Sequence, residues 1–285
     1  MRIPGDQRSG NGHRTALWRL AAGKSRRCLG AGLRDHLDPQ GNSARETRSV
    51  SVPHPQLLLD FPVGTAKALA SFVPGPNAEV LHRLQGCTTE DGFVCLWLYG
   101  TSGTGKTHLL QGVCRHAARL EVAAAYLPGS LAESDPEAGL QALRGLGGYG
   151  LVALDDLDCW LGLPGAEEAV FEVYQSLYDR QAALIIACGA PPNDVPFGLD
   201  DLASRLRAAS CYRLHELDDP GKEQLLVSVA RERGFELPGE VTQFLLRRGD
   251  RDVAALLNSF ARIEHAALAD QRRLTVPLVK RVLGL

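Results

Sequence analysis

The sequence contains few aromatic residues and lacks the features that mark several other classes of protein. Phe, Trp and Tyr make up 6% of its 285 residues, and no apolar run approaches the ~18 residues of a membrane span. Its seven cysteines include no C-x2-C pair, and no segment recurs at a fixed period. The sequence therefore argues against a zinc ribbon, a disulfide framework and a repeat architecture. It favours a cytoplasmic protein with buried thiols and no membrane segment.

Positive charge is scarce outside the first 50 residues. Residues 1–50 hold ten of the 31 Lys and Arg residues and four of the 33 acidic ones, so the rest of the chain carries 21 basic and 29 acidic residues. A body with a net charge of −8 lacks the broad basic face with which proteins grip duplex DNA. Tight DNA binding by the body alone is therefore disfavoured.

The hydrophobic pattern divides the chain into four parts. Residues 1–50 are rich in Gly, Arg and Ser; they are Arg-rich like a transit peptide, but their glycines favour a disordered, dispensable tail. Residues 51–70 form a linker. Short apolar runs then alternate with amphipathic stretches, which predicts an α/β domain with a parallel sheet over residues 71–217. Only helical periodicity follows, so residues 218–285 are predicted to form a helical domain whose first helix is capped by Asp219. The expected strands are 93–99, 122–127, 151–154, 183–187 and 211–214.

A phosphate-binding loop follows the first expected strand. Residues 100–107, GTSGTGKT, fit the pattern G-x-x-x-x-G-K-[ST] and open an amphipathic helix. Glycines allow the backbone N–H groups to turn toward a phosphate, the lysine adds a cation, and the last threonine offers a hydroxyl to Mg²⁺. The sequence therefore predicts that ADP or ATP binds here with Mg²⁺. The candidate binding residues are Gly100, Gly103, Thr104, Gly105, Lys106, Thr107 and the following His108, which we expect to be solvated.

Two carboxylates end the strand expected at residues 151–154. Downstream of a phosphate-binding loop, Asp155 is the candidate Mg²⁺ ligand together with Thr107, and Asp156 is the candidate catalytic group that orients or deprotonates an attacking water. Acids after a strand also serve as helix caps, and Asp156 or Asp158 could do so here.

Several further segments resemble the DnaA-like AAA+ family. From about Ser71 to Leu285 the chain is most similar to the Hda branch of that family, the regulatory inactivators of DnaA. The resemblance implies a P-loop AAA+ core with a parallel sheet and a C-terminal helical lid domain. It rests on residues 72–77 (FVPGPN), 155–158 (DDLD), 202–206 (LASRL), 234–238 (GFELP) and 250–253 (DRDV).

The resemblance also assigns roles to single residues. Phe72 and Val73 lie where the family cups the adenine, and Arg251 lies at the position of its sensor-II arginine. Arg205 matches the arginine finger that reaches a neighbour's ATP. Without this resemblance and the P-loop, the residues alone would favour an ordinary surface arginine paired with Asp200 or Asp201. Family members carry a polar sensor-I residue where residues 187–192 have neither acid nor amide. Hydrolysis in cis is therefore in doubt, and the complete P-loop leaves a weak intrinsic ATPase activity open.

A short peptide precedes the α/β domain. Residues 56–61, QLLLDF, resemble the Q-L-x-L-x-F peptide that docks on the bacterial sliding clamp. Leu59 and Phe61 would enter an apolar pocket while Gln56 bonds polar groups at its rim, with Leu57 completing the motif. The alternative is an edge strand or a hydrophobic linker.

The resemblance implies a negative regulator of DNA replication initiation. Bound to adenine nucleotide and to the DNA polymerase III sliding clamp, such a protein stimulates ATP hydrolysis by DnaA and reaches DNA only through the clamp. Because the sequence ends directly after the expected lid, we expect no helix-turn-helix domain and no initiator role. As a separate expectation, the protein forms homo-oligomers. A stand-alone ATPase such as a helicase loader is the alternative, and an adaptor that uses nucleotide only to fix its geometry is a third.

Overall fold

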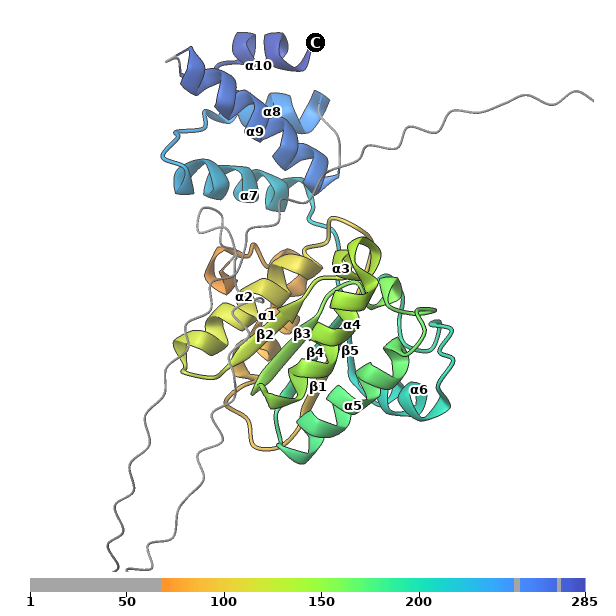
Figure 1. The fold of residues 1–285 in the computed structure, drawn as a ribbon. Coiled ribbons are helices and arrows are strands. Elements are labelled where there is room, and N and C mark those ends of the chain that lie inside the picture. Colours follow the sequence, from red (N-terminus) through yellow and green to blue (C-terminus); the bar gives the residue numbers. More distant parts are fainter. Residues whose placement is uncertain (1–67, 249–251, 271–272, 285) are drawn as a thin grey trace, which may run out of the picture. The chain divides into compact units, whose positions relative to one another are not determined.

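The computed structural model describes residues 68–248, 252–270 and 273–284. Within them, five parallel strands form one sheet in the order β2-β3-β4-β1-β5 (Figure 1). The predicted α/β fold with a parallel sheet is therefore confirmed, because each expected apolar run overlaps one strand. The strands are β1 (Val94–Tyr99), β2 (Ala124–Leu127), β3 (Leu151–Leu154), β4 (Ala183–Cys188) and β5 (Ser210–Arg213).

Alternate residues of each strand enter different hydrophobic cores, because successive side chains point to opposite faces of a sheet. In β4, for example, Ile186 packs into one core and Ile185 into the other. All six residues of β4 are buried, as expected for the middle of a parallel sheet with both faces covered. The sheet thus separates two apolar layers.

Helices cover both faces of the sheet (Figure 1). One face packs against the helices that precede and follow β1, and the other against helices from the remaining crossovers. The first group is α1 (Ala78–Gly86) and α2 (Lys106–Arg119), preceded by the 3-10 turns η2 (Leu69–Ser71) and η3 (Gly75–Asn77). The second is α3 (Ser130–Ser134), α4 (Pro136–Arg144), α5 (Ala166–Asp179) and α6 (Asp200–Arg207), with the turns η4 (Gly145–Gly148) and η5 (Leu157–Cys159).

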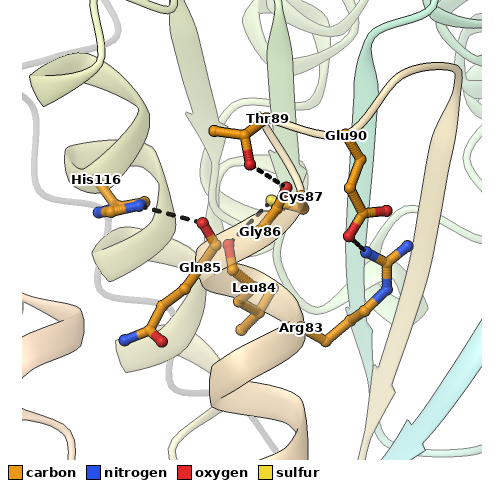
Figure 2. A network of polar contacts seen from close by, with 8 residues as sticks. All are labelled: Arg83, Leu84, Gln85, Gly86, Cys87, Thr89, Glu90 and His116. Carbon is orange, nitrogen blue, oxygen red and sulfur yellow. Dashed lines mark hydrogen bonds and ion pairs between the residues drawn. The ribbon is translucent and has the colours of Figure 1, made fainter.

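A polar network fastens the end of α1 (Figure 2). The Thr89 hydroxyl donates to the Gly86 carbonyl at 3.0 Å, and the Cys87 thiol donates to the Leu84 carbonyl at 3.1 Å. On α2, the His116 ring lies 3.2 Å from the Gln85 carbonyl. These bonds satisfy carbonyls that the end of a helix leaves without intrahelical partners, and they join α1 to α2.

The C-terminal part has a hydrophobic core of its own, centred on Phe260 and Ile263. Its first helix begins one residue earlier than the sequence indicates, because the cap is Asp218, whose carboxylate accepts from the Gly221 N–H at 2.9 Å, and not Asp219. The helices are α7 (Asp219–Glu232), α8 (Gly239–Arg248), α9 (Val253–Ala269) and α10 (Val276–Leu283).

The cysteines in the described residues are free. Burial raises the pKa of Cys87, Cys95, Cys114 and Cys188 to about 12, so these thiols are poor nucleophiles at neutral pH. Cys211 is exposed, contrary to the expectation that the thiols are buried, because it lies on β5 at the edge of the sheet. None of the described helices combines the length and hydropathy that a membrane span needs.

Candidate nucleotide-binding site

The P-loop connects the carboxyl end of β1 to the first residue of α2. Gly105 caps α2 with a φ of 95°, a backbone conformation that residues with a Cβ rarely adopt. A Cβ at Gly105 would also lie 2.8 Å from Cε2 of Phe72. Glycine is therefore needed both for the turn and for the close approach of Phe72. The turn leads directly into the N-terminus of α2, and the N–H groups of a helix N-terminus form a ready site for an anion.

Lys106 is hydrogen-bonded within this loop. Its ammonium donates to the carbonyl oxygens of Gly100 at 2.7 Å and Thr101 at 3.2 Å, and the side chain is buried, with 8% exposed. The Thr104 hydroxyl donates to the Thr101 carbonyl at 2.9 Å, which closes the loop on itself. Hydrogen bonds within the loop therefore hold it in the shape of a phosphate-binding cradle.

Residues 72–77 are fixed near this loop by Asn77. Its side-chain amide donates to the His215 carbonyl at 2.9 Å, and its oxygen accepts from the His215 N–H at 2.8 Å. Asn77 is buried, so both bonds are shielded from water and hold the segment to the chain that follows β5. Phe72 reaches the P-loop from this anchored segment.

His108 differs from the sequence expectation of a solvated ring. It is half-buried, and its Nε2 lies 3.0 Å from the Ala68 carbonyl and 3.5 Å from the Ser71 hydroxyl. The ring meets Phe72 edge to face, with 5.4 Å between ring centroids. His108 therefore supports Phe72, a role that depends on residues about 40 positions earlier in the chain and is invisible in the local sequence.

The two carboxylates after β3 lie in different environments. Asp155 is 2% exposed, and its Oδ2 accepts a hydrogen bond of 2.8 Å from the Tyr126 hydroxyl on β2. Burial raises the pKa of Asp156, and the neighbouring charge of Asp155 raises it further, whereas Lys106 lowers it. Asp156 also has a left-handed backbone, with φ 44° and ψ 60°, which costs roughly 1–3 kcal/mol for a residue other than glycine. Such strain is typical of functional sites.

One cavity brings most of the candidate residues together. Phe72, Val73, residues 100–108 and Asp156 all line it, which covers every described nucleotide-binding candidate. Asp155 contributes no surface to this cavity. Asp158 and Gly189 are among the further lining residues, and neither was a candidate site residue in the sequence analysis. The acidic run at residues 155–158 was the available signal for Asp158, which was considered there as a possible helix cap.

The chain's residues fit a nucleotide with Mg²⁺. A helix N-terminus, glycines with positive φ and a buried lysine line one cavity and form a phosphate cradle, and Phe72 offers an apolar ring beside it. Mg²⁺ usually takes one or two protein ligands and completes its shell with phosphates and water. Thr107 lines the cavity and would be one of them; Asp155, the other ligand expected from the sequence, contributes no surface there, whereas Asp156 does. The bound ion would neutralise phosphate charge, while Lys106 and the backbone N–H groups orient the phosphates.

Arg205 lies apart from this cavity, at the end of α6. Its guanidinium stacks on two aromatic rings of α5, 5.2 Å from the Phe171 centroid and 5.5 Å from that of Tyr174. Among the residues that the structure describes, no carboxylate lies within 4.0 Å of Arg205, so it pairs with neither Asp200 nor Asp201. Arg251 and the clamp candidates Gln56, Leu57, Leu59 and Phe61 lie outside the described residues.

The comparisons with known proteins agree with the fold. Residues 219–283 match the family model of the Hda lid domain. Domain III of the Thermotoga maritima replication initiation protein DnaA has a similar fold, with a TM-score of 0.67 and 20% identity over 78% of this chain and 98% of that one. AMPPCP-bound DnaA from Aquifex aeolicus gives 0.58 and 23% over 71% and 66%. The Thermotoga maritima branch migration motor RuvB gives 0.57 and 13% over 76% and 71%.

Proposed function

We propose that this chain, an Hda-like protein with a DnaA-type AAA+ fold, is a DnaA-related regulator of replication initiation that binds an adenine nucleotide at its P-loop. The observation that carries the proposal is a complete phosphate cradle, with Lys106 buried inside it, in a chain whose C-terminal helices match the Hda lid. Nucleotide binding at this loop would be measured by calorimetry with ADP.

A more specific proposal is that Arg205 acts on a nucleotide bound to another protein. Arg205 would contact the γ-phosphate of ATP on a DnaA partner and neutralise the charge that develops during phosphoryl transfer. Its position supports this, because it is half-buried at the end of α6 and rests on ring faces instead of on a carboxylate. Stacking leaves N–H groups at the edge of the guanidinium for phosphate oxygens. The peptide of residues 56–61 would tether the protein to the sliding clamp.

The test is the conversion of ATP-bound to ADP-bound DnaA with sliding clamp loaded on DNA. Arg205→Ala should lower the stimulation by about 10³-fold or more, the scale expected when an arginine finger is lost. Arg205→Lys should restore little, since an ammonium lacks the planar fork of donors. Arg207→Ala is the matched control, because Arg207 is an exposed arginine on the same helix.

Loss with Arg207→Ala instead would move the finger to that residue, and near-normal conversion by both variants would refute the proposal. Removal of Arg205 should also destabilise the fold slightly, because each cation–π contact contributes about 0.5–2 kcal/mol. Thermal melting of Arg205→Ala checks that the loss of stimulation does not come from unfolding.

A second candidate function is a stand-alone ATPase, such as a helicase loader. The observation that favours it is the presence of both carboxylates after β3, with Asp156 facing the same cavity as Lys106. ATP turnover by the purified protein in the absence of DnaA distinguishes the two. Turnover abolished by Asp156→Asn, together with no effect on DnaA, would favour this second function.

A further inference from the structure

A hydrogen-bonded pair joins the loop after β3 to the end of β4. The Asp158 carboxylate accepts from the Gly189 N–H, at 3.0 Å to Oδ2 and 3.3 Å to Oδ1. Asp158 lies in η5, two residues after Asp156, and Gly189 directly follows β4. Hydrogen bonds to a charged acceptor are the stronger kind, and this solvent-exposed pair connects two segments 31 residues apart.

Glycine at position 189 leaves room for this approach. A Cβ at position 189 would lie 2.9 Å from Asp158 Oδ2, so a larger residue there would push the carboxylate aside. Residues 187–192 carry no side-chain acid or amide, so at the end of β4 Asp158 meets the backbone N–H of Gly189 and the thiol of Cys188. Asp158 and Gly189 both line the cavity that also contains Lys106 and Asp156.

The left-handed backbone of Asp156 is fixed by contacts of the residues before and after it in the sequence. Before it, Asp155 is bonded to Tyr126, and after it, Asp158 is bonded to Gly189. Beneath it, Gly129 packs so closely that a Cβ there would lie 2.7 Å from the Asp156 carbonyl oxygen. A strained backbone persists only where its surroundings fix it, and these three contacts supply that constraint.

We propose that Asp158 is a positioning residue that holds the Asp156 carboxylate at the phosphate cradle by tying its loop to the Gly189 N–H. Asp158 itself contacts neither phosphate nor metal in this role. A shift of the end of β4 would consequently move Asp156. Through the bond between Asp158 and Gly189, β4 is therefore coupled to the part of the site where Mg²⁺ would bind. The inference rests on the proposed nucleotide binding.

The variants are Asp158→Ala, which removes the acceptor, and Asp158→Asn, which keeps one acceptor oxygen. Affinity for ADP is measured by calorimetry with Mg²⁺ and with EDTA. Asp158→Ala should weaken binding by about 10-fold or more with Mg²⁺, the lower end of the effect of losing a partner that orients a metal-site residue. Binding in EDTA should be unchanged, because it depends on the P-loop. Asp158→Asn should recover most of the loss.

Gly189→Ala provides an independent variant, since its methyl group displaces the same carboxylate. It should reproduce the Asp158→Ala effect, and the double variant should be no worse than either single one. Asp91→Ala is the matched control, because it removes an exposed aspartate in the loop before β1. Equal loss with and without Mg²⁺, or wild-type binding by Asp158→Ala, would overturn the proposal.

Hydrogen exchange separates this inference from the proposed nucleotide binding. In the nucleotide-free protein, the Gly189 amide should exchange faster in Asp158→Ala than in wild type, because its acceptor is gone. If exchange is faster but the protein binds no ADP, the nucleotide site is refuted while the hydrogen bond between Asp158 and Gly189 is supported. Unchanged exchange of this amide would refute the tie itself.

Discussion

Replacing Tyr126 by phenylalanine removes one hydroxyl from the interior of the sheet. That hydroxyl donates to Asp155 Oδ2 at 2.8 Å and also bonds the Gln111 side chain, while the ring stays packed among apolar neighbours. Because Asp155 is 2% exposed, water cannot easily replace the lost donor. A hydrogen bond to a charged group contributes about 1.5–3 kcal/mol. In a protein of 150–250 folded residues, this corresponds to a fall in Tm of roughly 3–12 °C.

The assay is thermal unfolding of the nucleotide-free protein in EDTA, followed by ADP binding with Mg²⁺. Tyr178→Phe is the control, because Tyr178 is 48% exposed and lies on α5. Tyr126→Phe should melt lower than both wild type and the control, and its Mg²⁺-dependent gain in ADP affinity should fall by about 10-fold. A melting temperature within about 1 °C of wild type would mean a change smaller than the expected fall and would refute the role assigned to this bond.

Four further predictions follow from the site and the tether. Lys106→Ala should weaken ADP binding in calorimetry because the cradle loses its cation, and unchanged affinity would contradict the P-loop assignment. Gly105→Ala should destabilise the protein by about 1–2 kcal/mol in urea unfolding, since alanine is strained at a positive φ, and a neutral effect would contradict the geometry. Because burial raises the pKa of Asp156, the nucleotide-free protein should lose stability as pH rises from the ordinary aspartate value through the higher folded pKa. Asp156→Asn should abolish that loss and be the more stable form at neutral pH, and an unchanged pH profile would count against it. Changing Leu59 and Phe61 to alanine should abolish retention on immobilised sliding clamp while ADP affinity stays the same; undiminished retention would refute the clamp motif.

The sheet was predictable because its strands are short apolar runs between turn residues. Leu151–Leu154 was predicted to the residue, since Gly150 and Asp155 bound it on both sides. The second strand begins at Ala124 and not at Val122, because the Val122 N–H bonds the Ala117 carbonyl and finishes the preceding helix. Hydrophobicity alone does not distinguish an apolar residue that closes a helix from one that opens a strand.

The site was predictable only where its residues are consecutive. The P-loop and the two acids are local patterns, and the structure brings Lys106 and Asp156 to one cavity. The tie between Asp158 and Gly189, and the stacking of Arg205 on Phe171, join residues more than 30 positions apart. Such contacts depend on which strands are neighbours, and single-residue patterns do not carry that information.

The strand order has one consequence for the kind of ligand that the site accepts. β4 lies between β1, which leads into the P-loop, and β3, which ends at Asp155. Neighbouring strands are about 4.8 Å apart, so the two loops leave the sheet roughly 10 Å from one another. Backbone hydrogen bonds hold this spacing, and surface substitutions leave it unchanged. The single strand β4 therefore sets the length of the phosphate chain, with its cation, that the P-loop and the loop after β3 can contact at the same time.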